Sequence, residues 1–195
     1  SWSSQALVAR HKARDAIWRQ RALSLLAFAI ATNRTAVLPQ AFCYCDAFWG
    51  AMVGCRVKAA HASMSLPFEC PIDHLIELQS WYNQGAVRWR PPRFLQHYYP
   101  QHDSGQRVKI SADSLSSSGG LREDGLLAAL LPQGVATAAV VELSLPHAER
   151  VLCGFTSPHL QASLRTATRL LRYSRLFCFS EGAPPQTGEA APCCT

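Results

Sequence analysis

A long helical pattern that runs directly into a short apolar strand is the feature that most constrains this fold. Over residues 11–32 the apolar side chains recur at helical spacing, and Asn33 suits the end of that helix. Residues 35–39, Thr-Ala-Val-Leu-Pro, predict a short buried strand that ends at its proline. A helix followed at once by a buried strand is half of an α/β repeat.

Helices and strands continue to alternate in the second half of the chain. We predict strands at 107–111, 136–143 and 175–179, and helices at 121–131 and from Ser157-Pro158 onward. This alternation predicts an α/β fold with a mostly parallel sheet flanked by helices. Residues 1–181 are expected to form a single α/β domain, and residues 182–195 a flexible tail.

Residues 40–102 interrupt the regular pattern. They hold Cys43, Cys45, Cys55, Cys70 and most of the aromatic residues. We therefore expect a long disulfide-linked loop region after the first strand, with one short helix at 73–81. Ligands of α/β sheets bind beyond the C-terminal ends of the strands, so we expect function in residues 40–81.

The composition excludes two classes of chain. Hydrophobic residues make up 48% and charged residues 16% of the 195 residues, which excludes an intrinsically disordered chain. The longest apolar run, residues 22–31, is shorter than the roughly 20 residues that a membrane span needs. Residues 1–21 hold five basic residues and no apolar block, so a targeting or membrane segment is expected only outside this chain.

Positive charge gathers near the start of the chain. The formal net charge is +6, and residues 1–40 hold six Arg or Lys against the single acid Asp15. Such a basic face attracts nucleic acid, anionic lipid or a nucleotide diphosphate, or it is simply a solvated helix face. No nucleic-acid-binding motif accompanies it, so we expect no nucleic-acid partner.

The chain holds eight cysteines, which form either disulfides or metal sites. They lack the paired C-x2-4-C spacing of zinc sites, so we expect disulfides and no metal site; the cysteines are Cys43, Cys45, Cys55, Cys70, Cys153, Cys178, Cys193 and Cys194. Disulfides indicate an oxidising compartment. Asn33-Arg34-Thr35 is an N-glycosylation sequon, although its position between a helix and a buried strand argues against modification.

Four stretches carry a resemblance to a known family. They are residues 26–39, ending Asn-Arg-Thr-Ala-Val-Leu-Pro; Cys43-Tyr-Cys-Asp-Ala-Phe-Trp49; Cys55 with Leu66-Pro-Phe-Glu-Cys-Pro-Ile-Asp-His74; and Arg172-Tyr-Ser-Arg-Leu-Phe-Cys178. In this order they resemble the C-terminal portion of the nucleotide-sugar transferases that arabinosylate hydroxyproline-rich proteins in plants and green algae. The resemblance is strongest over residues 10–80.

The resemblance implies a retaining transfer of a sugar, most simply an arabinose-like pentose, from a nucleotide sugar to a hydroxyproline-rich or cell-wall-type glycoprotein in the Golgi or secretory-pathway lumen. Family members use a GT-A catalytic domain with an Asp-x-Asp motif, where Mn or Mg neutralises the diphosphate. This chain has no Asp-x-Asp. We therefore expect the nucleotide sugar and the divalent cation in an upstream catalytic domain of the same protein, and no activity from this chain alone.

Two alternatives stay open. The chain could be a non-catalytic structural, carbohydrate-binding or protein-binding module that retains the family fold. It could also belong to an O-fucosyltransferase-like GT-B enzyme, since those enzymes carry a similar helix-to-strand segment.

Six residues are candidates for the site. Asp73 and His74 could bind a sugar hydroxyl or assist proton transfer, or Asp73 could simply cap a helix. The substrate-binding candidates are Arg34 for a phosphate, Asp46 beyond the first strand, and Trp49 and Trp81 for stacking on a sugar ring. For each of these four, an ordinary structural role is the alternative.

Overall fold

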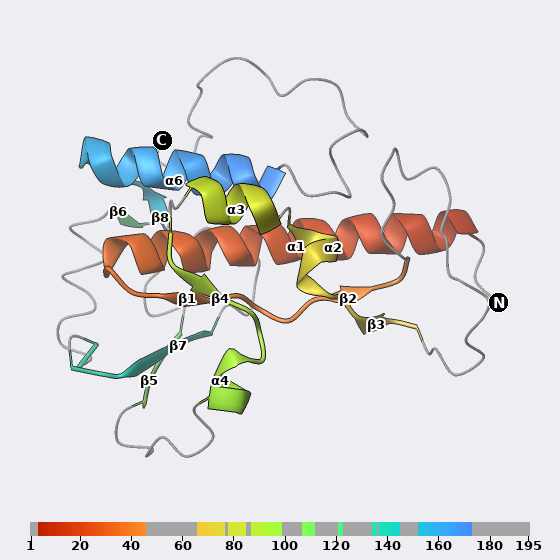
Figure 1. Cartoon of the computed structure of the whole chain (residues 1–195), viewed down its shortest axis with the longest axis horizontal. Helices are drawn as coiled ribbons and strands as arrows, with labels where there is room; N and C mark the ends of the chain where they lie inside the picture. The colour runs from red at the N-terminus through yellow and green to blue at the C-terminus, as the bar shows by residue number, and fades with distance from the viewer. Residues whose placement is uncertain are drawn as a thin grey trace.

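One long helix runs through the middle of the structure. The computed structural model describes residues 4–45, 66–76, 78–84, 87–98, 107–111, 121–122, 134–135, 137–144 and 152–172. In chain order the elements are α1 (Ser4–Ala31), β1 (Ala36–Val37), β2 (Phe42–Cys43), β3 (Phe68–Glu69), α2 (Ile72–Leu75), α3 (Leu78–Gln84), β4 (Trp89–Arg90), α4 (Phe94–Tyr98), β5 (Arg107–Ser111), β6 (Leu121–Arg122), β7 (Val140–Ser144), β8 (Leu152–Gly154) and α6 (Pro158–Arg172) (Figure 1).

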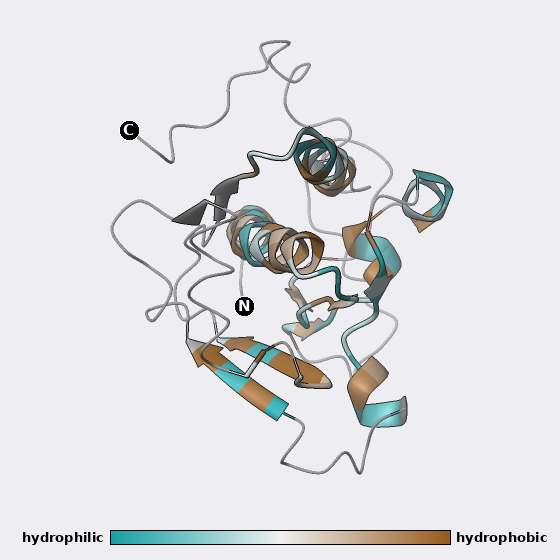
Figure 2. Ribbon diagram, turned by 90° about the vertical axis from the view of Figure 1, so that its left-hand side faces the viewer, coloured by the Kyte–Doolittle hydropathy of each residue, from teal (hydrophilic) through white to brown (hydrophobic). Residues whose placement is uncertain are grey.

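The helix α1 is buried on more than one side in its C-terminal half. The α6 helix packs beside it, and the β5–β7 pair lies on the other side (Figures 1 and 2). Trp18, Ala22 and Leu26 join one hydrophobic cluster, while Ala27 and Phe28 join a second cluster with strand β5. A helix that is apolar on several faces is stable only when other elements surround it, which explains why residues 22–31 are apolar except for Ser24.

The C-terminal end of α1 fits the predicted passage from helix to strand. The backbone N–H of Arg34 donates to the carbonyl of Ala29 at 2.8 Å, and that of Asn33 donates to Ile30 at 3.3 Å. Asn33 itself has a φ of 52°. These are the bonds of a Schellman motif, in which asparagine tolerates the left-handed conformation. The chain then enters β1 directly.

The structure confirms a mixture of helices and short strands. Its described strands form four two-stranded sheets, β1–β4, β2–β3, β5–β7 and β6–β8. The β2–β3 pair is antiparallel and the other three are parallel. The longest pair aligns Arg107 with Val140 and Ser111 with Ser144.

The disulfide between Cys43 and Cys70 confirms that the region after the first strand is cross-linked. The two residues are 27 positions apart, and their Cα atoms lie 5.2 Å from each other. The backbone N–H of Cys70 also donates to the carbonyl of Ala41 at 3.0 Å. The disulfide and this hydrogen bond together hold β2 next to β3. Cys45 is disulfide-bonded as well.

Two predicted helices differ from the structure. The helix expected at 73–81 is divided into α2 and α3, because Ile76 is extended (φ −133°, ψ 152°) and its side chain is fully buried. Core packing of that side chain outweighs the local helical preference. The helix expected at 121–131 is wrong at its start, where Leu121–Arg122 pairs with β8 as strand β6.

Other predictions concern parts of the chain that lie outside the described residues. These are the remainder of 121–131, the strand at 175–179 and the tail at 182–195. Among the helices described, none combines the length and the apolar character needed to cross a membrane.

Candidate functional site

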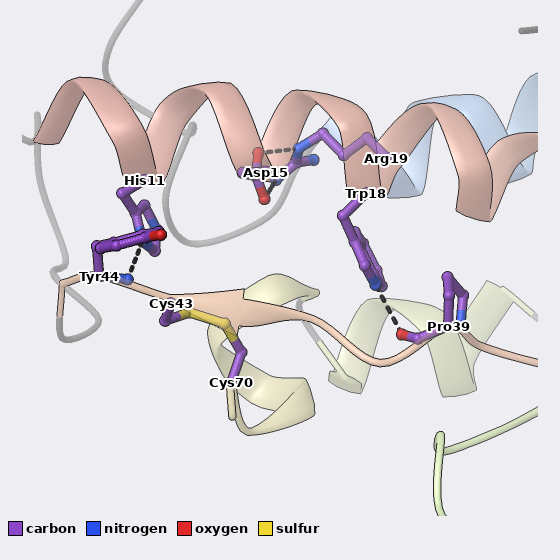
Figure 3. Close-up of a disulfide and its surroundings, with 8 residues drawn as sticks. All are labelled: His11, Asp15, Trp18, Arg19, Pro39, Cys43, Tyr44 and Cys70. Carbon is purple, nitrogen blue, oxygen red and sulfur yellow. Dashed lines mark hydrogen bonds and ion pairs between the residues drawn. A yellow bond between two sulfur atoms is a disulfide. The ribbon is translucent and has the colours of Figure 1, made fainter. Parts of the chain in front are cut away.

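A small pocket lies between the N-terminal half of α1 and the disulfide-linked segment (Figure 3). The helix contributes His11, Arg14, Asp15 and Trp18, and the facing wall consists of residues 41–43 with Cys70 and Leu75. The pocket has room for about one water molecule. It can therefore accept a single polar group, and not a whole sugar ring.

Helix geometry explains why these four side chains meet. Residues three, four and seven positions apart lie on one face of an α-helix, so His11, Arg14, Asp15 and Trp18 face the same way. The stripe continues the apolar face that packs into the core. The opposite wall is held in place by the antiparallel pairing of Cys43 with Phe68 and by the disulfide.

His11 is a buried hydrogen-bond donor at this pocket. Its side chain is only 2% exposed, and Nδ1 accepts a hydrogen bond from the backbone N–H of Tyr44 at 3.2 Å (Figure 3). A neutral imidazole whose Nδ1 accepts must carry its proton on Nε2. Within the described residues, Nε2 has no hydrogen-bond partner. His11, one of the residues that line the pocket, thus carries a buried N–H that an oxygen atom could satisfy.

Burial keeps the His11 ring neutral. It lowers the pKa of His11 to about 4, with smaller electrostatic contributions from His74 and Arg19. The imidazole therefore carries no charge near neutral pH. It acts there as a hydrogen-bond donor and not as a cation.

Next to His11, Asp15 forms a bidentate ion pair with Arg19. Arg19 Nε lies 2.5 Å from Oδ2 and Nη2 lies 3.3 Å from Oδ1 (Figure 3). Burial raises the pKa of the Asp15 carboxyl, and the guanidinium partly opposes that effect. Both carboxylate oxygens accept hydrogen bonds from Arg19. Asp15 is therefore an ion-pair partner beside the pocket, and its carboxylate is not positioned as a base for a ligand.

Of the predicted catalytic candidates, His74 lies near this pocket. His74 and Asp73 are both on α2 and both half-buried. The His74 ring meets Phe68 edge-on, with ring centres 6.4 Å apart, and the next residue, Leu75, lines the pocket. Asp73 is not the N-cap, because Pro71 occupies that position and no side-chain cap bond forms there.

Arg34 and Trp81 have structural partners elsewhere. Arg34 donates to the backbone carbonyls of Val135 at 2.5 Å and Ala138 at 2.8 Å, and so anchors a turn more than 100 residues away. Trp81 is buried, and its ring meets that of Trp89 edge-on with ring centres 5.8 Å apart. Neither side chain lines the pocket. Asp46 and Trp49, the remaining two candidates, lie outside the described residues.

Sequence reasoning missed His11 and Asp15. A signal was present: both lie on the same helical stripe as Trp18 and Ala22, and Asp15 is the single acid in residues 1–40. A polar or ionisable side chain on a buried stripe requires a partner. The presence of His11 and Asp15 on an otherwise apolar stripe was therefore the available indication of a buried polar cluster.

The polar side chains among the residues that line the pocket are those of His11, Arg14 and Asp15. In the part of the chain that the structure describes, no three His, Cys, Asp or Glu side chains gather in a way that could hold a metal ion.

Comparisons of the chain with family models, with curated proteins and with solved structures found no match.

Proposed function

We propose that this chain is the acceptor-side portion of a glycosyltransferase that moves an arabinose-like pentose from a nucleotide sugar to a hydroxyproline-rich or cell-wall-type glycoprotein. One observation carries the proposal. Three stretches with the family resemblance, distant in sequence, meet around the pocket. Pro39 accepts a hydrogen bond from Trp18, which lines the pocket. Cys43 is bonded to Cys70, and both of these residues line the pocket as well.

The pocket supports a role in positioning the acceptor. The Nε2–H of His11 is a buried donor, and the pocket that His11 helps to line has room for one hydroxyl group. A hydroxyl oxygen of the acceptor that accepts this bond would be held in one orientation, and orientation of a reactant is a large part of catalysis by transferases. Under this proposal, His11 is a binding residue and the reacting atoms lie outside the pocket.

The nucleotide sugar and a divalent cation belong, in this proposal, to an upstream catalytic domain of the same protein. The disulfide of Cys43 with Cys70 and the bonded state of Cys45 support an oxidising compartment such as the Golgi lumen. The proposal also includes the finer fold expectation, in which the parallel pairs belong to one mostly parallel sheet flanked by helices.

The test is sugar transfer by the intact protein, measured with a radiolabelled UDP-pentose and a hydroxyproline peptide in the presence of Mn. We expect His11→Asn to raise the KM for the peptide while leaving the KM for the nucleotide sugar unchanged. His97→Asn, at an exposed histidine of α4, is the matched control and should change neither value. An intact protein that transfers no sugar contradicts the proposal, as does transfer by residues 1–195 alone.

A non-catalytic module that retains the family fold is the second candidate. The observation that favours it is the size of the pocket, which admits a single polar group, together with the structural partners of Arg34 and Trp81. Binding of a hydroxyproline glycopeptide without turnover, measured by calorimetry on the intact protein, would favour this candidate. Catalytic turnover that depends on His11 would exclude it.

A further inference from the structure

The sequon at the end of α1 lies on the surface. Asn33 and Thr35 are both exposed, and Asn33 is the left-handed residue that terminates the helix, with a φ of 52°. The sequence position alone argues against modification, because a helix and a buried strand flank the sequon. The structure shows that the turn between them projects both side chains to solvent, where an attached glycan would displace no packed side chain.

Arg88 fixes the orientation of the Asn33 side chain. Its Nη2 donates to the backbone carbonyl of Asn33 at 2.7 Å and to Oδ1 at 3.0 Å. A guanidinium can only donate hydrogen bonds, so the oxygen of the amide must face Arg88. The amide nitrogen Nδ2 is then directed away from Arg88. N-glycosylation takes place at Nδ2 and leaves the carbonyl oxygen intact, so the bond to Arg88 is compatible with the modified protein.

We propose that Asn33 is an N-glycosylation site of this protein. In the reaction, a bond forms between Nδ2 and the anomeric carbon of a lipid-diphosphate-linked oligosaccharide. The bond from that carbon to the diphosphate oxygen breaks, the lipid diphosphate leaves, and Nδ2 loses one proton. The inference rests on the lumenal compartment of the proposed function, since the lipid-linked donor is available there.

The position of the glycan is compatible with the candidate site. Helix α1 rises about 1.5 Å per residue, so the 20 residues from His11 to the end of the helix at Ala31 span about 30 Å. A glycan on Asn33 is therefore attached at the opposite end of α1 from the pocket. It leaves the proposed acceptor-binding surface open.

The test directs the protein into the secretory pathway of a host cell, so its result does not depend on where the native protein is located. The full chain is expressed behind a cleavable signal peptide in a eukaryotic secretory host, and the secreted protein is treated with peptide N-glycosidase. We expect the enzyme to remove one glycan and to convert Asn33 to Asp, a mass change that peptide mass spectrometry locates. Asn83, an exposed asparagine without a sequon, is the internal control and should remain unchanged.

Two substitutions of Thr35 separate loss of the site from loss of the fold. Thr35→Ala should abolish the glycan completely while Asn33 is retained, and Thr35→Ser should keep it because the sequon still ends in a hydroxyl residue. Secreted wild-type protein with unmodified Asn33 overturns the inference. If Asn33 is glycosylated in this host but carries no glycan in the intact protein from its native cell, the sequon is accessible but the native protein is not modified, and both the inference and the lumenal function are contradicted.

Discussion

The indole Nε1 of Trp18 donates a hydrogen bond to the backbone carbonyl of Pro39, 2.7 Å away (Figure 3). This contact joins the middle of α1 to Pro39, two residues beyond the end of β1 at Val37. The chain then continues into β2, which forms one wall of the pocket. The position of that wall relative to His11 therefore depends on Trp18.

Trp18→Phe should lower the free energy of unfolding by about 1–2 kcal/mol. Phenylalanine retains most of the apolar contact but leaves the Pro39 carbonyl without its donor. Urea unfolding at pH 7 measures the change. Tyr82→Phe, at a side chain that is 70% exposed, is the control and should cost less than about 0.5 kcal/mol. Equal effects of the two substitutions would show that the Trp18 bond contributes nothing.

Replacing Cys43 and Cys70 together by alanine should lower the free energy of unfolding by about 2–4 kcal/mol. The disulfide closes a loop of 27 residues, and the loss of a cross-link restores the conformational entropy of the unfolded chain. Non-reducing peptide mapping should first recover the two cysteines in one linked peptide. A native sample in which both thiols react freely with iodoacetamide would contradict the disulfide and weaken the secretory assignment.

The buried ion pair of Asp15 with Arg19 should respond to substitution much more than an exposed pair. Arg19→Met leaves a buried carboxylate without its charged partner. The substitution should lower the free energy of unfolding by about 3 kcal/mol at pH 8. Because burial already raises the pKa of Asp15, the carboxyl takes up a proton as the pH falls, and the loss should be smaller at pH 5.

Lys109→Met is the matched control for this pair. Lys109 lies 3.6 Å from Glu142, and both side chains are largely exposed. Its substitution should cost less than about 1 kcal/mol and show little dependence on pH. Thermal unfolding of the two variants at both pH values provides the comparison. A loss for Arg19→Met that does not change between pH 8 and pH 5 would contradict the proposed charge on Asp15.

Local patterns predicted the elements whose ends have their own chemistry. Asn33 marks the end of α1 and is observed in the left-handed conformation there, and Ser157-Pro158 marks the start of α6. Strand β5 has the predicted bounds, Arg107–Ser111. In each case, one or two residues favour the element regardless of what lies around it in the fold.

Long-range contacts could not be predicted in this way. Arg34 was a candidate for phosphate because it lies near a predicted strand. The carbonyls that it contacts, those of Val135 and Ala138, lie 101 and 104 residues away in sequence. The pocket likewise depends on His11 meeting Tyr44, 33 residues later. Nothing in the periodicity of either segment specifies its partner, whereas the folded chain brings the two together.

The last prediction concerns the pH dependence that His11 gives to stability. In the folded protein its pKa is lowered to about 4, chiefly by burial, while in the unfolded chain it returns to about 6.5. Between these values the unfolded chain binds the proton and the folded protein does not. Stability is therefore full above pH 6.5 and falls as the pH drops toward 4, by about 1.4 kcal/mol per pH unit.

Urea unfolding at pH 7.5 and pH 5.0 should show this loss as about 2 kcal/mol in the difference between the wild type and His11→Asn. His11→Asn keeps an acceptor for the Tyr44 N–H and does not titrate, so its stability should change much less over the same range. Asp15 acts in the opposite direction, because its raised pKa favours the folded state as the pH falls, but it is present in both proteins and cancels in the difference. His97→Asn, at an exposed histidine, should behave like the wild type. If wild type and His11→Asn lose the same stability between the two pH values, His11 is not a buried neutral imidazole, and the donor assigned to the pocket is lost with it.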